Sequence, residues 1–131
     1  MILLDTHIWV WWVNDQQKLK PTTLRYLDNL PPANVFISAI SCWEVAKLVQ
    51  KRRLQIREPL SDWFKNAIDS NGLTVIELER EIVIDACTLP GTFHNDPADQ
   101  LIVATARTRG ISLLTIDSKI LSYEYVQLHQ E

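Results

Sequence analysis

The feature that most constrains this fold is the opening run Met1-Ile2-Leu3-Leu4, which leads directly into Asp5. A continuous apolar run of this length predicts a strand buried on both faces, as in a parallel sheet covered by helices. Asp5 then lies where the strand leaves the core. In open α/β sheets ligands bind at this carboxyl end of the strands. The run therefore predicts an α/β fold with an acidic group at its ligand-binding edge.

Short apolar runs alternate with helical patterns along the rest of the 131 residues. This alternation is typical of a parallel sheet with right-handed crossovers and helices on both faces. No boundary for a second domain is visible, so residues 1–131 are expected to form a single domain. We expect strands at residues 1–4, 35–38, 73–76, 111–115 and 125–128, and helices at residues 6–13, 21–30, 39–53, 58–71, 79–89, 97–109 and 118–121.

Composition argues against several classes of protein. No apolar run approaches the roughly 20 residues of a membrane helix, and the start lacks the basic flank of a signal peptide. We therefore expect a cytoplasmic protein that is not bound to a membrane. Cys42 and Cys87 lie far apart without zinc-site spacing, and are expected to be buried, reduced thiols. The net charge of -3 argues against broad, non-specific binding of nucleic acid but leaves a local basic face open.

Four acidic residues fall where they can converge. Asp5 ends the first strand, and Asp117 lies just past the fourth. Asp99 lies in the first turn of the helix expected at residues 97–109, and Glu44 lies in the middle of the helix that follows the second strand. Carboxylates grouped at one edge of a sheet repel each other unless a cation lies among them.

Each acid also has a purely structural interpretation. Strand-end aspartates are often turn or cap residues. Asp96, followed by proline and by another acid three residues on, is expected to be a helix N-cap. Asp99 suits the helix dipole. Glu44 is flanked by apolar residues, so its charge needs a partner. That partner is either a cation or Lys47 one turn away.

Taken together, the acids predict a metal site. Oxygen-only ligands suit Mg²⁺ or Mn²⁺, as one or two ions, rather than zinc. Such ions usually serve phosphate chemistry, because they neutralise phosphate oxygens and activate water. The sequence has no Ser-His-Asp or Cys-His arrangement and no glycine-rich phosphate loop to compete with this interpretation.

Four segments resemble, in order and at compatible spacing, the motifs of the PIN-domain ribonucleases, and among them the VapC-type toxins of bacterial type II toxin-antitoxin pairs. Each motif alone is weak, but together they cover essentially the whole chain. The segments are Leu3–Trp9, Ser38–Lys47, Leu89-Pro90 with His94–Ala106, and Leu113–Asp117.

The resemblance implies a three-layer α/β fold with a five-stranded parallel sheet of order 3-2-1-4-5, whose crevice lies between the first and fourth strands. It also implies a metal-dependent endoribonuclease that acts on RNA, a VapB-type antitoxin as partner, and a homodimer. It assigns metal ligation and catalysis to Asp5, Glu44, Asp99 and Asp117.

We accordingly expect an RNA phosphodiester to be hydrolysed by water, with the three aspartates at a principal ion. Glu44 is expected to hold a second ion or to orient the water. Thr6 and Thr115 are expected to orient carboxylates or waters. The chain departs from the family pattern at three positions. The family often has Arg, Phe and Arg there, whereas this chain has Asn95, Ala98 and Gln100. Two cations are thus missing from the mouth of the site, so we expect altered substrate preference more than altered chemistry.

A basic run follows the second acid along the chain. Lys47, Lys51, Arg52 and Arg53 are candidates for contacts with the RNA backbone. The alternative is a solvated helix end whose cations suit the dipole. Lys47 is expected nearest the site, because it lies one turn from Glu44.

Five tryptophans are many for this length. Trp9, Trp12 and Trp43 are expected in the core. Trp11 and Trp63 are candidates for a face that binds a partner or a second subunit, because large aromatic side chains are favoured anchors there.

Two rival functions remain open. A receiver-type signalling domain also groups acids and Mg²⁺ at the top of a sheet, but it needs a phosphorylatable Asp after the third strand, where this chain has Glu77. A catalytically idle interaction module would keep the PIN fold with an unused metal site.

Overall fold

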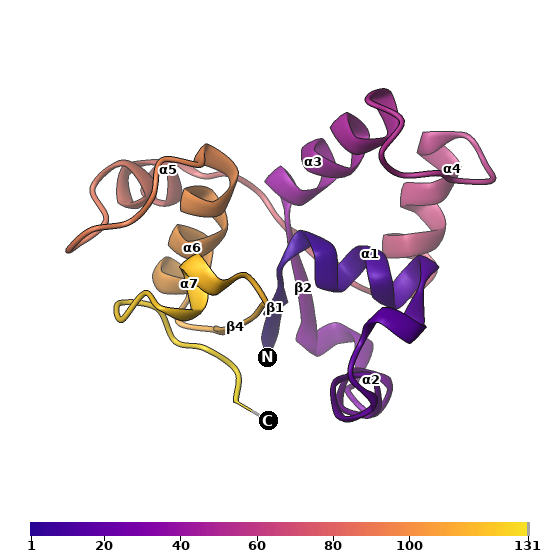
Figure 1. Cartoon of the computed structure of the whole chain (residues 1–131), viewed down its shortest axis with the longest axis horizontal. Coiled ribbons are helices and arrows are strands. Elements are labelled where there is room, and N and C mark those ends of the chain that lie inside the picture. Colours follow the sequence, from indigo (N-terminus) through magenta and orange to yellow (C-terminus); the bar gives the residue numbers. More distant parts are fainter. Residues whose placement is uncertain (131) are drawn as a thin grey trace.

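The computed structural model describes residues 1–130 and contains a four-stranded parallel sheet between two layers of helices (Figure 1). The strands run in the order β3-β2-β1-β4, which confirms the predicted α/β class and this part of the predicted order. The same order excludes the receiver alternative, because receiver domains place their third strand beside the first. The strands are β1 (Ile2–Leu4), β2 (Val35–Ser38), β3 (Thr74–Ile76) and β4 (Ser112–Leu114).

The prediction of a fifth strand at residues 125–128 is wrong. Within residues 1–130 this segment pairs with β4 through a single parallel bridge between Leu113 and Leu128. The Leu113 amide donates to the Gln127 carbonyl, and the His129 amide donates to the Leu113 carbonyl, both at 2.9 Å. The Arg107 guanidinium donates to the Tyr125 carbonyl at 2.7 Å. The Tyr125 carbonyl is thus paired with a side chain of the helix at residues 97–109 rather than with β4.

Most of the predicted helices are present with shifted ends. The helix predicted at residues 39–53 ends earlier, and Arg52 beyond it has a left-handed φ of 57°. The single helix predicted at residues 58–71 is an α-helix followed by a π-helical segment, Lys65–Asp69. Within residues 1–130 no helix is long and apolar enough to cross a bilayer. The α-helices are α1 (Thr6–Asn14), α2 (Pro21–Asp28), α3 (Ala39–Gln50), α4 (Leu60–Phe64), α5 (Arg80–Cys87), α6 (Pro97–Arg109) and α7 (Ser118–Leu121), with short 3₁₀ segments at Gln16–Lys18 and Pro32–Asn34.

The central strand β1 contributes side chains to two apolar cores, one on each face of the sheet. Ile2 and Leu4 pack into the core beneath α1, α2 and α4, whereas Leu3 packs against α6 and α7. All three side chains are fully buried. Figure 1 shows α1, α2 and α4 on one side of the strands and α5, α6 and α7 on the other. The alternation explains why the opening run is apolar at every position rather than at every second one.

Two tryptophan predictions are wrong. Trp43 was expected in the core, yet 54% of it is exposed. Trp63 was a surface candidate, yet it is 2% exposed and packs against buried Trp9, with ring centroids 5.2 Å apart and ring planes tilted by 59°. On α3 the buried positions are Ser41 and Val45, so residue 43 faces away from the core.

The other aromatic and thiol predictions divide. Trp12 is only half-buried, as is Trp11, and both pack against the edge of the core beneath α1. Cys42 is half-buried, but Cys87 at the end of α5 is exposed. Both cysteines are free thiols. The expected buried position is wrong for Cys87, because this residue is exposed.

Candidate active site

The carboxyl ends of β2, β1 and β4 meet at one edge of the sheet. The parallel register pairs Leu4 with Ile37 and with Leu114, so the next residue of each strand lies at the same level. Several helices begin at this edge, where their free N–H groups favour negative charge. The side chains that cap the helices there are Asp5 for α1, Ser38 for α3, Asp96 for α6 and Asp117 for α7.

Asp5 is the most buried acid of this edge, with 6% of it exposed. The Thr115 hydroxyl donates to its Oδ2 at 2.6 Å, and the Thr6 amide donates to its Oδ1 at 2.8 Å. Burial raises the pKa of the Asp5 carboxyl, and these two hydrogen bonds oppose the rise. The charge of Asp117 raises the same pKa further, so the two strand-end acids interact electrostatically across the β1–β4 pair.

Glu44 reaches the same edge from α3. The Thr6 hydroxyl donates to Glu44 Oε1 at 2.5 Å, and the buried Ser41 hydroxyl lies 2.8 Å from the same Thr6 oxygen. Burial raises the pKa of the Glu44 carboxyl from 4.5 to about 7, although the Thr6 hydrogen bond opposes the rise. The charges of Asp5, Asp99 and Asp96 also raise it, so Glu44 belongs electrostatically to the acidic group.

Asp99 reaches the edge from the first turn of α6, whose start is capped by Asp96 through the Asp99 amide at 3.2 Å. The His94 Nε2 lies 2.7 Å from Asp99 Oδ2. Burial raises the pKa of the Asp99 carboxyl, the His94 contact lowers it, and the charges of Asp96, Asp5 and Asp117 raise it. The sequence led us to expect His94 to support the loop before Asp96 and to have no catalytic role. Its contact with Asp99 was not predicted, and its position five residues before Asp99 was the only signal.

Asp117 lies just beyond β4 and starts α7. Its Oδ1 accepts hydrogen bonds from the Lys119 amide at 2.8 Å and the Ile120 amide at 3.4 Å. The Asp117 amide in turn donates to the Thr115 hydroxyl oxygen at 3.0 Å. Thr115 therefore links the backbone of one acid to the side chain of the other acid, Asp5.

The four acids fit a divalent cation in donor chemistry and in charge, because they offer only oxygen ligands and because the charges of neighbouring acids raise the pKa values of Asp5, Glu44 and Asp99. Their side-chain positions fit less well. Among residues 1–130, no three acidic, His or Cys side chains lie close enough together to hold one ion. Each of the four carboxylates instead contacts a different hydroxyl, backbone amide or imidazole group. The side chains would therefore have to rotate to share an ion. The expected placement of three aspartates around one principal ion is not met by these side-chain positions.

The residues of the predicted basic run lie in two places, one on α3 itself and one beyond its end. Lys47 lies near the acids on α3, but within residues 1–130 no ion pair joins it to Glu44. Its ammonium donates to Gln50 Oε1 at 3.1 Å and lies 5.6 Å from the centroid of the Trp43 ring. Lys51, Arg52 and Arg53 are exposed beyond the end of α3.

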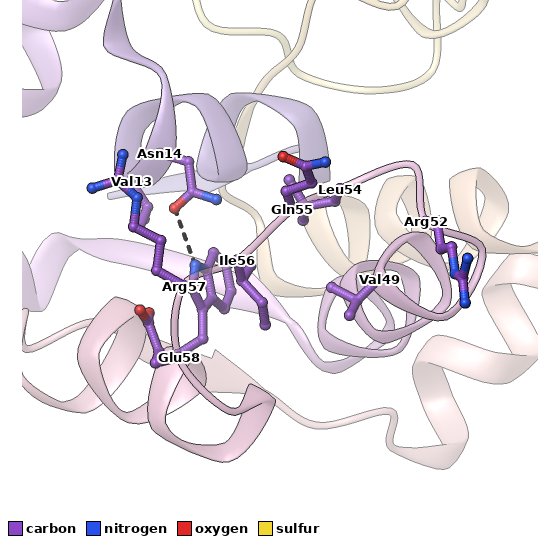
Figure 2. A pocket seen from close by; sticks show the side chains of 10 residues that line it. Val13, Asn14, Val49, Arg52, Leu54, Gln55, Ile56, Arg57 and Glu58 are labelled. Atoms are coloured by element: carbon purple, nitrogen blue, oxygen red, sulfur yellow. Dashed lines mark hydrogen bonds between the residues drawn. The ribbon is translucent and has the colours of Figure 1, made fainter.

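Arg52 borders a hollow of about 830 Å³ between α1, the end of α3 and α4 (Figure 2). Figure 2 shows Asn14 and Arg57 on another wall of this hollow. The dashed line is the hydrogen bond of 3.0 Å that the Trp63 indole donates to Asn14 Oδ1. None of the four candidate acids lines the hollow, so it is separate from the acidic edge.

A second, smaller hollow does adjoin the acids. It has a volume of about 520 Å³ and lies between the first turns of α3 and α6. Its wall is mainly apolar, but Glu44 and Asp96 contribute to it. We call this hollow the α3–α6 groove. The residues that line it are Ala39, Ile40, Trp43, Glu44, Leu78, Asp96, Pro97 and Ala98.

Comparison with known proteins gives a consistent picture. The chain matches the PIN domain family over residues 2–124. It is 29% identical over 124 residues to the Mycobacterium tuberculosis protein named Ribonuclease VapC22, with 95% of this chain and 92% of that protein covered.

Solved structures share the fold at lower identity. VapBC2 from Rickettsia felis, bound to a DNA fragment from its promoter, gives a TM-score of 0.69 at 22% identity, with 98% of each chain covered. Mycobacterium tuberculosis VapC20, described as a Sarcin-Ricin loop cleaving toxin, gives 0.68 at 17% identity, with 99% of this chain and 100% of that chain covered. FitAcB from Neisseria gonorrhoeae gives 0.69 at 19% identity, with 99% and 97% covered.

Proposed function

This chain belongs to the PIN domain family, and on that premise we propose that it is a metal-dependent endoribonuclease that acts as the toxin of a VapBC-type pair. The proposal is supported by the name of its relative, Ribonuclease VapC22, whose match spans nearly the whole chain. It is also supported by the described RNA-cleaving activity of VapC20, which has the same fold.

The observation that carries the proposal is the electrostatic repulsion among acids that come from four separate segments of the chain. Asp5, Glu44 and Asp99 each have a raised pKa to which the charges of the other acids contribute. Such a grouping is destabilising in a protein that binds no cation, because buried like charges repel. The grouping lies at the crevice between β1 and β4, where open α/β sheets bind their ligands.

In the proposed reaction, Asp5, Asp99 and Asp117 hold Mg²⁺ or Mn²⁺, and Glu44 holds a second ion or orients the attacking water. The bound cation supplies charge neutralisation at the phosphate and activation of water. Thr115 and Thr6 keep the Asp5 carboxylate oriented through the hydrogen bonds to its two oxygens. Thr6 also holds Glu44 through its hydroxyl.

His94 belongs to the proposed site as a positioning residue. Its Nε2 lies 2.7 Å from Asp99 Oδ2, and the side-chain Nε2 of Gln100 donates to the His94 carbonyl at 3.0 Å, which fixes the loop before α6. The effect of the His94 contact is to favour the charged carboxylate of Asp99, which is the form that binds a cation.

The proposed partners are an RNA substrate, a VapB-type antitoxin and a second copy of the chain. Solved structures of the same fold include toxin-antitoxin complexes, among them one from Klebsiella pneumoniae. A direct test is to look for a small reading frame beside the gene for this chain and to produce the chain together with the protein that this frame encodes. We expect a stable complex that no longer cleaves RNA, and cleavage at the full rate in its presence would contradict the partner.

Lys47, Lys51, Arg52 and Arg53 are proposed to contact the RNA backbone. Their charge is concentrated around the end of α3 in a chain with net charge -3. Reversing Arg52 and Arg53 to Glu is expected to weaken RNA binding and to flatten its salt dependence. An unchanged salt dependence would make these two residues only a solvated helix end.

The nuclease proposal is tested by cleavage of a structured RNA with Mn²⁺ or Mg²⁺. We expect activity that EDTA abolishes and that Asp5→Asn reduces by orders of magnitude. Asp69→Asn, which removes an exposed carboxylate of the π-helical segment, is the matched control and should cleave like the unchanged protein. Full activity in EDTA or in Asp5→Asn would overturn the proposal.

The competing function is an interaction module with the PIN fold and an unused site. It is favoured by the finding that, within residues 1–130, no three ligand side chains lie together. A protein whose melting temperature does not change with Mn²⁺ and that cleaves no RNA would have this function.

A further inference from the structure

Trp43 is the one exposed tryptophan of the described chain, and nothing in the proposed chemistry uses it. The other four are buried or half-buried, whereas 54% of Trp43 is exposed. It precedes Glu44 directly on α3, on the face opposite Ser41 and Val45. A single exposed aromatic side chain is common on protein surfaces, so a binding role for Trp43 depends on the surface that surrounds it.

The exposed indole forms part of the α3–α6 groove. Ile40, Leu78 and Pro97 are apolar residues of its wall, and Glu44 and Asp96 are the acidic residues of the same wall. A volume of about 520 Å³ lies within the range of small-ligand sites, which is roughly 300–1,000 Å³. The groove therefore has room for a flat group of the size of a nucleobase with its ribose.

Charge near the indole points to the same kind of ligand. The Lys47 ammonium lies 5.6 Å from the centroid of the Trp43 ring, so a cation is held beside the aromatic surface. Single-stranded nucleic acid is bound by this combination, in which the aromatic ring stacks on a base and the cation attracts a phosphate. The carboxylates of Glu44 and Asp96 would repel an anion in the groove, but they accept hydrogen bonds from the amino group of a base.

We propose that the α3–α6 groove binds one nucleobase of the RNA next to the cleaved phosphodiester, stacked on Trp43. The stack then selects which nucleotide lies at the cleavage point. This inference rests on the ribonuclease function proposed above, and it adds a residue that determines specificity rather than one that takes part in the reaction.

The experiment measures binding of short, fluorescein-labelled single-stranded RNAs by fluorescence anisotropy in Mg²⁺. The protein carries Asp5→Asn, so that the RNA stays intact. One base at a time is replaced by an abasic nucleotide. We expect one position at which removal of the base weakens binding on the order of tenfold. Trp43→Leu should cause a similar loss with intact RNA and should remove the effect of that abasic position, whereas Trp43→Phe, which keeps a ring, should restore much of both.

The possible results separate the proposals. Equal binding of Trp43→Leu and its parent, with cleavage by the unchanged protein intact, would overturn the stacking and leave the nuclease. Cleavage by Asp5→Asn would overturn the nuclease assignment, while the paired loss from Trp43→Leu and the abasic RNA would still establish the base contact. A protein that binds no RNA would overturn both.

A second copy of the chain is the main rival occupant of this face. Leu78 lines both the groove and a neighbouring hollow that includes exposed Ile84 of α5. Sedimentation of Trp43→Leu and Ile84→Ala distinguishes the two. We expect Trp43→Leu to keep the oligomeric state of the unchanged protein. Dissociation by both variants, with the response to abasic RNA unaltered, would assign Trp43 to an interface between copies and overturn the proposal.

Discussion

The Thr115 hydroxyl donates a hydrogen bond of 2.6 Å to Asp5 Oδ2 and thereby joins residues that lie 110 positions apart. The same hydroxyl oxygen accepts the Asp117 amide. One threonine therefore orients a candidate ligand on β1 and anchors the turn that carries another beyond β4. No other single side chain of the described site contacts both.

Replacing Thr115 with Val removes this link while keeping the shape of the side chain. We expect a loss of about 1–3 kcal/mol in the free energy of unfolding, because a buried carboxylate oxygen and an amide both lose their partner. RNA cleavage should fall as well. Thr115→Ser keeps the hydroxyl and is the control in urea denaturation and in the cleavage assay. Equal stability of the Val and Ser variants would show that the hydrogen bond contributes nothing.

The stability of the protein without divalent cations should fall as the pH rises from about 4.5 to about 7. The pKa of Glu44 is raised from 4.5 to about 7 by folding, so the native state binds a proton in this range that the unfolded state has released. Stability then decreases with pH, because the native state holds more protons than the unfolded state. Urea denaturation in EDTA across this range measures it. Glu44→Gln should flatten the dependence, and an unchanged slope in that variant would exclude Glu44 as its cause.

Removing one acid should stabilise the protein in EDTA but weaken its response to metal. Asp99→Asn relieves repulsion from Asp5, Asp96 and Asp117, so its melting temperature in EDTA should exceed that of the unchanged protein. Added Mn²⁺ should raise the melting temperature of the unchanged protein much more than that of the variant. Asp69→Asn should respond to Mn²⁺ like the unchanged protein. Identical responses in all three proteins would place the metal elsewhere.

Removing His94 should make metal binding more sensitive to acid. The His94 contact lowers the pKa of the Asp99 carboxyl, so His94→Ala lets that pKa rise and more of the carboxyl is protonated in mild acid. We expect the Mn²⁺ affinity of the variant, from calorimetric titration, to fall more steeply on acidification. His94→Gln, which keeps a donor, should lie between the two. A parallel pH dependence of all three would remove His94 from the site.

The parts of the fold that could be predicted are those with dense local signals. The apolar run of β1 and the proline and glycine that bound α6 predicted those elements at nearly their observed positions. The strand order came from the family resemblance, because pairing of β1 with both β2 and β4 depends on contacts distant in sequence. At the missing fifth strand, the Tyr125 carbonyl is paired with Arg107 from a distant helix, which no local pattern of residues 125–128 reveals.

The candidate site was predicted in its residues better than in its contacts. Glu44 was identified because an acid among apolar neighbours needs a partner, but its partner proved to be Thr6 rather than Lys47. Helical periodicity places Trp43 on the face of α3 opposite Val45, so the signal that Trp43 lies outside the core is present in the sequence of α3. The burial of Trp63 depends on its packing with Trp9, 54 positions away in the sequence, and no periodicity within α4 predicts that.

Because β1 pairs with β4, the candidate site is completed late in the synthesis of the chain. During synthesis the first strand emerges early, but its neighbour at residues 112–114 emerges only after most of the chain has been translated. A nascent polypeptide therefore carries Asp5 without the threonine and the aspartate that complete its surroundings. On the proposed function, the ribosome that makes this nuclease is exposed to it only once translation has passed the last of its acids.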